Sequence, residues 1–307
     1  MMLMTIGVLA LGEGLVDILS AEDGTVRELP GGSPLNLAVG LGRLGHDVTL
    51  ATWIGQDARG RRLAEHLAAC GVRLLPGSSG AGRTSSATVS HQPSGGEAAY
   101  VFEVEWRCPG LPPGLRPGWV HAGSIAAVLA PGGAEVLAAV RRLRPHCLVS
   151  FDPNLRPAII GDAEQVRPLI EAYVDLADVV KVSAEDLRWL CPGVPVDRVA
   201  HDWRRRGPAL LVVTDGAKGA RAWTAAGELT RPAIPVEVAD TVGAGDAFMA
   251  GLLHGLVESG FAGACRRDAL SRLSLEDSAR ALEIASRVAA LTVARPGADP
   301  PWLEELG

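Results

Sequence analysis

The stretch Asp240-Thr241-Val242-Gly243-Ala244-Gly245-Asp246-Ala247-Phe248 is the most informative part of the chain. The run before it, residues 234–238, is expected to be a strand, and the run after it, residues 247–258, a helix. Its glycines let successive backbone N–H groups converge at the positive end of the helix dipole, which makes a pocket for an anion. Asp246 then stands where it can take a proton from a hydroxyl that attacks a bound phosphoryl group. The alternative is a glycine turn whose aspartate caps a helix.

Short runs rich in valine, leucine and isoleucine alternate with longer amphipathic runs, which is typical of βαβ units that build a parallel sheet. The runs expected to be strands of this sheet are residues 5–11, 48–54, 119–122, 147–151, 179–182 and 209–214. The runs expected to be helices are residues 35–44, 58–70, 133–143, 163–173, 196–206, 247–258 and 275–293. Residues 15–20 and 86–106 are expected to be strands with no helix between them, so a small separate sheet is expected beside the main one.

The composition indicates a folded protein of a reducing compartment. Of the 307 residues, 48% are hydrophobic and 21% are charged, which excludes a disordered chain. The formal net charge of -6 argues against a general nucleic-acid binder, which needs a basic face. The five cysteines include no CxxC pair, so neither a disulfide framework nor a cysteine zinc site is expected. The apolar N-terminus lacks a basic segment and soon reaches Glu13, so we expect no membrane span and a cytoplasmic protein.

The nonapeptide 240–248 resembles the C-terminal signature D-T-x-G-A-G-D-x-F of the PfkB, or ribokinase-like, family of carbohydrate kinases. Residues 31–38, GGSPLNLA, are similar to the N-terminal family motif GG-x-x-x-N-x-A. Residues 151–156, FDPNLR, resemble the F-D-P-N-x-R segment of the fructokinase and 2-keto-3-deoxygluconate kinase branches. The resemblance continues in the segments that start at Lys181, Thr214 and Arg295, and so covers essentially the whole chain.

This resemblance implies a fold as well as an activity. It implies one ribokinase-like domain over residues 1–307, a three-layer α/β/α structure with a mostly parallel central sheet. The small sheet would form a discontinuous β lid from about residues 14–31 and 84–110. Closure of this lid would exclude water, and an exposed face on it favours a homodimer through the lid.

The resemblance also implies roles for residues at both substrates. Asp246 would be the catalytic base, and the N–H groups of Gly243, Ala244 and Gly245 would stabilise charge on the transferred phosphoryl group. The residues implied to bind the sugar together with Asp246 are Asp17, Gly32, Asn36, Arg107 and Arg156. The residues implied to bind ATP are Ser183, Thr214, Gly216, Gly219, Gly243, Gly245 and Ser286. Arg156 could hold either an acid sugar or the nucleotide, because a guanidinium pairs with carboxylates and phosphates alike.

The implied cofactors are ATP and Mg²⁺, with K⁺ as a further candidate. The family's N-x-x-E element, which organises Mg²⁺ through water, appears here as Ser183-Ala184-Glu185-Asp186, so Asp186 or Glu185 is expected to take that role. Asp240 and residues 292–297 match the region that binds a monovalent cation in several members. Pro301 removes a hydroxyl that could have served this site, which leaves potassium dependence open.

The resemblance implies transfer of the γ-phosphoryl of ATP to a hydroxyl of a small sugar, and the FDPNLR segment favours a fructokinase-like enzyme. A 2-keto-3-deoxygluconate kinase is the first alternative, for which Phe102 and Arg107 of the lid are candidates to contact the substrate carboxylate. The second alternative is a non-catalytic sugar- or nucleotide-binding regulator, which would have no need of Asp246.

Two other nucleotide-binding motifs are excluded. Residues 40–45 fit GxGxxG, but a helical run precedes them and a strand-like run follows, which is the inverse of a dinucleotide site. The sequence contains no GxxxxGK[ST] segment, so a P-loop kinase is not expected.

Overall fold

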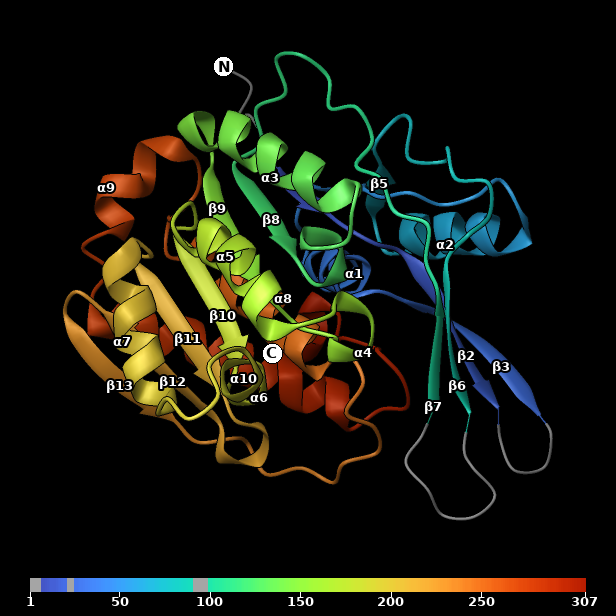
Figure 1. Ribbon diagram of the computed structural model, residues 1–307. Coiled ribbons are helices and arrows are strands. Elements are labelled where there is room, and N and C mark those ends of the chain that lie inside the picture. The colour runs from blue at the N-terminus through green and yellow to red at the C-terminus, as the bar shows by residue number, and fades with distance from the viewer. Residues whose placement is uncertain (1–6, 21–24, 91–98) are drawn as a thin grey trace.

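The computed structural model describes residues 7–20, 25–90 and 99–307, which form a large sheet between two layers of helices and a small sheet beside them (Figure 1). The large sheet has the strand order β13-β12-β11-β10-β9-β8-β1-β4-β5. Its strands are β1 (Val8–Leu11), β4 (Val48–Ala51), β5 (Val72–Leu74), β8 (Trp119–Gly123), β9 (Leu148–Asp152), β10 (Val179–Ser183), β11 (Leu210–Thr214), β12 (Ala220–Thr224) and β13 (Gly227–Arg231). Neighbouring strands are parallel except at β11–β12 and β12–β13.

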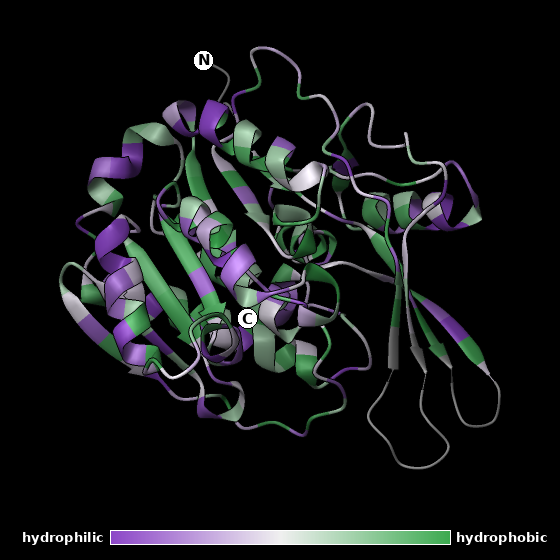
Figure 2. Cartoon of the chain, in the orientation of Figure 1, coloured by the Kyte–Doolittle hydropathy of each residue, from purple (hydrophilic) through white to green (hydrophobic). Residues whose placement is uncertain are grey.

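Helices cover both faces of this sheet, and each layer buries its own hydrophobic core against the strands. One layer contains α1 (Ser33–Arg43), α2 (Ala58–Ala69), α8 (Ala244–Glu258), α9 (Arg267–Leu270) and α10 (Leu275–Val293). The other contains α3 (Gly132–Leu143), α5 (Ala163–Val174), α6 (Ala184–Leu190) and α7 (Val196–Arg206). The short helical elements are α4 (Pro157–Ile160), η1 (Ile125–Ala127), η2 (Arg144–His146), η3 (Gly216–Lys218), η4 (Ala264–Arg266) and η5 (Leu303–Leu306). The strands between the layers are strongly hydrophobic, as a sheet covered on both faces requires (Figure 2).

The small sheet has the strand order β3-β2-β6-β7, and its strands extend away from the helical layers (Figure 1). They are β2 (Leu15–Ser20), β3 (Val26–Gly31), β6 (Ser86–Ser90) and β7 (Ala99–Glu103). Leu15 and Ala87 of this sheet pack with Ile125 of η1 in a small buried cluster. This contact fixes one end of the small sheet to the body of the molecule.

The predicted α/β fold, with a mostly parallel sheet and a small separate sheet, is confirmed. The first two residues of the predicted strand 5–11 lie outside the described residues. The predicted strand at 234–238 is wrong: Ile234, Val236 and Val238 are exposed, and Pro235 has no N–H to donate to a sheet. The hairpin of β12 and β13 is absent from the prediction, because charged residues such as Arg221 interrupt its apolar pattern.

The strand order identifies the edge of the large sheet at which a ligand site is expected. β1 has β4 on one side and β8 on the other, so the direction of the chain through the sheet reverses here. The carboxyl ends of parallel strands frame a crevice at such a reversal. Glu13, just after β1, bridges the two strand ends, because its Oε2 accepts a hydrogen bond from the N–H of Ala126 at 3.2 Å.

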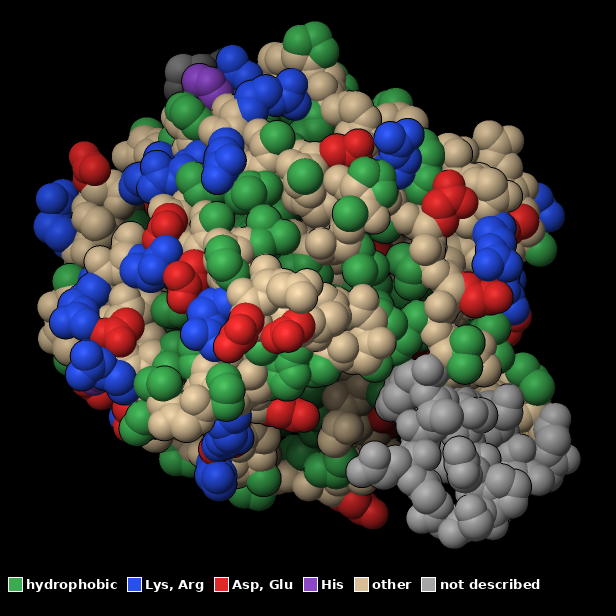
Figure 3. All heavy atoms as spheres, viewed as in Figure 1, with side chains coloured by type: hydrophobic (Ala, Val, Ile, Leu, Met, Phe, Trp, Pro, Cys, Tyr) green, Lys and Arg blue, Asp and Glu red, His purple; other side chains and the backbone are tan. Residues whose placement is uncertain are grey.

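In the part of the chain that the structure describes, no helix is both long and apolar enough to cross a membrane. Basic and acidic side chains are interspersed over the described part of the face drawn in Figure 3.

Candidate active site

The carboxylate of Asp246, in the first turn of α8, is the centre of the candidate site. It is 6% exposed and accepts side-chain hydrogen bonds on both oxygens. Oδ1 accepts from Ser33 Oγ at 2.6 Å and from Asn154 Nδ2 at 3.4 Å, and Oδ2 accepts from Asn36 Nδ2 at 2.9 Å. Three side chains from two segments distant in sequence therefore hold one carboxylate, and two of these side chains, Ser33 and Asn36, belong to the first turn of α1.

The N-termini of α1 and α8 meet at this carboxylate, and glycine makes both ends possible. Gly32 and Gly243 precede the two helices with φ of 102° and 74°, and neither helix has a side-chain cap. A side chain at position 243 would bring its first carbon within 2.6 Å of Ala298 Cβ, and one at 32 within 2.6 Å of the carbonyl oxygen of Glu13. Two positive helix ends with uncapped N–H groups converge beside Asp246, which favours binding of an anion there.

Asp17 and Arg156 lie within electrostatic range of this centre. Burial raises the pKa of the Asp17 carboxyl to about 6, the charge of Arg156 opposes the shift and that of Asp246 adds to it. Any side chain at Gly31, on the neighbouring strand β3, would overlap the Asp17 carboxylate. Arg156 is exposed and donates to Asn154 Oδ1 at 2.8 Å, so one residue joins this guanidinium to the environment of Asp246.

A buried ion pair lies beneath the first turn of α8. Lys181 Nζ is 2.5 Å from Asp152 Oδ2, and both side chains are almost completely buried. Lys181 also closely approaches Gly245, where the first carbon of a side chain would lie 3.0 Å from its Nζ. Burial raises the pKa of Asp152 to about 6, Lys181 opposes the shift, and the charges of Asp186 and Asp246 add to it.

The residues predicted to meet ATP lie mainly at the ends of β10 and β11. Ser183 is paired in register with Thr214. Ser183 Oγ accepts from the N–H of Asp186 at 2.9 Å, while Asp186 Oδ2 accepts from the N–H of Ser183 at 3.3 Å, which forms a capping box at the start of α6. Asp186 Oδ1 also accepts from the N–H of Leu155 at 3.0 Å, so this carboxylate joins α6 to the FDPNLR segment.

Two further predicted ATP residues, Gly216 and Gly219, bound the turn η3 with φ of 52° and 91°. Any side chain at position 219 would overlap the backbone of Arg231, so this turn requires glycine there. Ser286 is buried within α10, and the described contacts do not bring it to Asp246.

The predicted metal residues do not form a protein-built metal cage. Among the described residues, no group of three or more His, Cys, Asp or Glu side chains is arranged to hold a metal ion. Asp186 is occupied by the capping box, and Glu185 is exposed. This arrangement fits a Mg²⁺ that is held mainly by phosphate oxygens and water, which is how Mg²⁺ commonly binds nucleotides. Asp240 accepts from the N–H groups of Val242 at 3.0 Å and Gly297 at 2.9 Å, which joins the two segments predicted for the monovalent cation.

Arg107, which is predicted to bind the sugar, has its described contact with α3. Its Nη2 is 3.8 Å from Glu135 Oε1 of α3, and its side chain is 58% exposed. The described contacts bring it neither to Asp17 nor to Asp246.

Five buried or half-buried polar residues at the site were not predicted: Ser33, Asn154, Lys181, Asp152 and Glu13. Ser33 and Asn154 lie inside the motifs GGSPLN and FDPNLR, so their polar character within these motifs was the available signal. Burial raises the pKa of Glu13 to about 7, with hydrogen bonds from Ser124 and Ala126 opposing the shift. Its burial depends on η1, which the sequence does not indicate.

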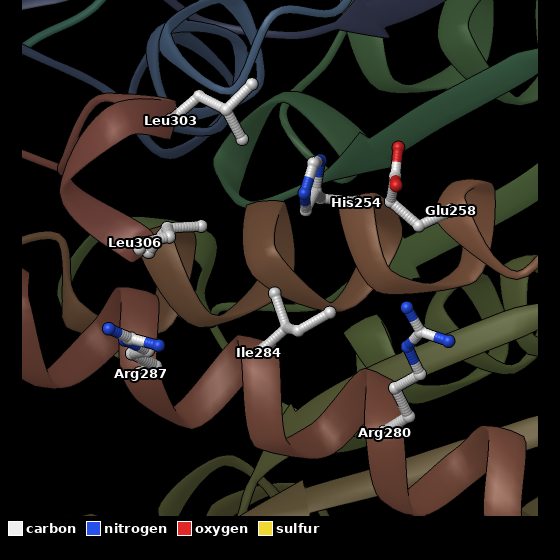
Figure 4. A pocket seen from close by; sticks show the side chains of 8 residues that line it. His254, Glu258, Arg280, Ile284, Arg287, Leu303 and Leu306 are labelled. Carbon is white, nitrogen blue, oxygen red and sulfur yellow. The ribbon is translucent and has the colours of Figure 1, made fainter.

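A cavity of about 340 Å³ lies elsewhere, between α8, α10 and η5 (Figure 4). It contains His254 and Glu258, which lie two turns or more along α8 from Asp246. None of its lining residues belongs to the predicted site.

A buried carboxylate between the N-termini of two helices, at the carboxyl edge of a parallel sheet, is an arrangement that can support phosphoryl transfer to a hydroxyl group. The sequence model described as pfkB family carbohydrate kinase matches residues 5–102 and 119–305, and the chain belongs to this family. It is a carbohydrate kinase, as the sequence predicts.

Individual proteins that are similar to this chain are also sugar kinases. The chain is 36% identical over 259 residues to fructokinase from Klebsiella pneumoniae, which covers 81% of this chain and 84% of the relative. It is similar to the crystal structure of fructokinase with bound ATP from Xylella fastidiosa, with a TM-score of 0.84, 27% identity, and coverage of 99% and 97% of the two chains. A double mutant of fructokinase from Vibrio cholerae with fructose, ADP and potassium ion bound gives a TM-score of 0.76, 26% identity, and coverage of 96% and 94%.

Proposed function

We propose that the chain is a fructokinase, which transfers the γ-phosphoryl group of ATP to a hydroxyl of fructose. The observation that carries the proposal is the Asp246 carboxylate, held between the N-termini of α1 and α8 in a chain whose similar proteins include fructokinases. ATP, fructose and potassium are bound in structures of such relatives, and we assign the same ligands to this chain.

In the proposed reaction Asp246 accepts the proton of the attacking sugar hydroxyl. The hydroxyl oxygen forms a bond to the γ-phosphorus as the bond to ADP breaks on the opposite side. The N–H groups of Gly243, Ala244 and Gly245 stabilise the charge of the transferred group together with the helix dipoles. Mg²⁺, when bound to the phosphates, supplies further positive charge. The residues proposed to bind the nucleotide are Thr214, Gly216, Gly219, Ser183 and Ser286.

We assign the sugar to the space between Asp17, Asn36 and Arg156. The Asp17 carboxylate would accept hydrogen bonds from sugar hydroxyls, and Gly32 would let the sugar approach the backbone. Asn36 already reaches Asp246, so it can align the sugar and the base together. The small sheet that carries Asp17 would act as the lid, and a homodimer through this sheet would cover its exposed Leu19 and Leu29.

Asp240 and residues 292–297 are proposed for a bound potassium ion, because the Asp240 carboxylate already joins these two segments beside Gly243. An ion here would stabilise the turn before α8. We place the protein in the cytoplasm, in agreement with its free cysteines.

A coupled assay of ADP release tests this function. Wild-type protein is given ATP, Mg²⁺ and one sugar at a time, including fructose, ribose and 2-keto-3-deoxygluconate, with Asp246→Asn as the background. The expected result is the highest kcat/KM with fructose. A kcat/KM at least tenfold higher for 2-keto-3-deoxygluconate would overturn the proposal in favour of the ketodeoxy-acid kinase.

Arg107→Ala distinguishes the same two substrates at the lid. The proposal expects the KM for fructose to be unchanged, because Arg107 is engaged with Glu135. A rise in KM for the ketodeoxy acid alone would show that Arg107 contacts a substrate carboxylate. ADP release that stays at the Asp246→Asn level with every sugar, while the sugars still bind, would instead indicate the non-catalytic regulator.

A further inference from the structure

The hydroxyl group of Ser33 has the shortest of the side-chain hydrogen bonds described on Asp246. Its Oγ lies 2.6 Å from Oδ1, and the residue is 8% exposed. A hydroxyl this close to a carboxylate forms a strong, charge-assisted hydrogen bond. Ser33 is the first residue of α1, so the helix backbone holds this geometry in place.

This geometry is the one that the kinase reaction requires of its acceptor. A base must lie within about 2.6–3.2 Å of the oxygen whose proton it removes. Among the described contacts, the only hydroxyl that meets this condition at Asp246 belongs to Ser33. The same carboxylate belongs to the turn Gly243–Asp246, which lies at the anion-binding end of α8.

We propose that Ser33 is an internal phosphoryl acceptor, which is phosphorylated by ATP at the active site of its own chain when no sugar is bound. Ser33 Oγ forms a bond to the γ-phosphorus, the bond from that phosphorus to the bridging oxygen of ADP breaks, and ADP leaves. The Oγ proton moves to Asp246 Oδ1. Atoms and charge balance with ATP as the sole co-reactant.

The environment stabilises the product of this step. Phosphoserine would carry its charge at the N-terminus of α1 and next to that of α8, where helix dipoles favour an anion. Protonation of Asp246 in the same step removes the carboxylate charge that would repel it. The modified enzyme would be inactive, because the phosphate occupies the position of the sugar hydroxyl.

A bound sugar should suppress the modification. The acceptor hydroxyl of the sugar must lie on Asp246, and this displaces the Ser33 hydroxyl from the base. The inference depends on the kinase chemistry of the family and not on fructose as the substrate, so it can be tested with ATP alone.

Mass spectrometry of the full-length chain tests the proposal. Wild-type protein is incubated with ATP and Mg²⁺ in the absence of sugar, then analysed intact and as peptides. The expected result is the gain of one phosphoryl group on Ser33, with sugar kinase activity declining in step. Ser33→Ala and Asp246→Asn should not gain it, and Ser271→Ala, which removes an exposed serine bonded to the backbone of Asp268, should behave as wild type.

The sugar on which the preparation is most active should slow the labelling at least tenfold. The proposal is overturned if wild-type protein that turns over a sugar remains unmodified after prolonged incubation with ATP. It is also overturned if Ser33→Ala or Asp246→Asn is labelled at the wild-type rate. If fructose is not a substrate, the labelling of Ser33 can still be measured with ATP alone. The two proposals are therefore tested independently.

Discussion

The N-termini of α1 and α8 contrast with those of α2 and α10 in how their free N–H groups are satisfied. α2 and α10 begin with side-chain caps: Asp57 accepts from the N–H of Gly60 at 2.8 Å, and Ser274 from the N–H of Asp277 at 3.0 Å. α1 and α8 begin at Gly32 and Gly243 without such a cap. All four helices lie in the same layer of the molecule.

The capped helix ends contribute to the stability of the fold, whereas the uncapped ends are available for function. A side-chain cap satisfies one of the free N–H groups at its helix end and stabilises the fold by about 1 kcal/mol. An uncapped end costs that stabilisation but keeps donors and dipole for an external anion. The N-termini of these two helices meet at Asp246, where the proposed reaction needs positive potential.

Among the substitutions that leave the Asp246 carboxylate in place, the largest effect is expected from Gly243→Ala. Its φ of 74° and the close approach of Ala298 exclude a side chain, so the anion-binding turn must distort. We expect kcat to fall at least ~100-fold, as for loss of a donor to the transition state. Gly260→Ala is the matched control, with a φ of 83° at the other end of α8, where a side chain would make only an ordinary contact with the end of Arg266 at 3.7 Å, and it should lower the melting temperature without affecting kcat.

Asn36→Ala should reduce kcat by about tenfold to 100-fold, because it removes the hydrogen bond that orients Oδ2 of the base. Steady-state kinetics with saturating ATP measures this change. A kcat equal to that of wild type would show that the N-terminus of α1 does not contribute to the reaction.

Sugar binding should weaken as the pH falls below about 6, where the Asp17 carboxyl becomes protonated in the free enzyme. The KM for sugar should rise by up to about tenfold per pH unit below this value, because a neutral carboxyl accepts hydroxyl hydrogen bonds less well. Asp17→Asn should have a high KM and lack this pH dependence. Retention of the same pH profile in Asp17→Asn would assign it to another group, such as Asp152.

Substitution of the capping residues of α2 and α10 should lower stability without lowering kcat, which is the opposite of the effect expected at α1 and α8. Asp57→Ala and Ser274→Ala should each lower the free energy of unfolding by about 1 kcal/mol and leave kcat unchanged. Although burial acts against it, hydrogen bonds from Thr84 and Gly60 lower the pKa of Asp57 to about 2. Its contribution to stability is therefore complete above about pH 4 and is lost as the pH falls towards 2. Urea denaturation at pH 7 and pH 3 measures both effects.

The sequence predicts most of the fold because a buried parallel sheet leaves valine-rich runs that can be read directly. The prediction of a strand fails at residues 234–238, where the alternating apolar residues Ile234, Val236 and Val238 are exposed and Pro235 cannot donate a hydrogen bond to a sheet. The sequence pattern also misses β12 and β13, whose polar residues alternate in an edge hairpin.

The candidate site was also predicted only in part. Gly243, Asp246 and Asn36 lie in motifs with a clear chemical meaning, and the structure brings them together. Ser33 lies in the same motif as Asn36, but its polar character there does not identify its partner Asp246, from which it is 213 residues distant. The ion pair of Lys181 with Asp152 depends in the same way on the alignment of β9 with β10.

Asp246→Asn provides the most direct test of the claim that this carboxylate is the base at two anion-binding helix ends. The substitution preserves size and removes the ability to accept a proton, so kcat should fall by about 10²–10⁴-fold. The affinity for ADP, measured by calorimetry, and the melting temperature should stay close to those of wild type. A kcat within tenfold of wild type would contradict the account.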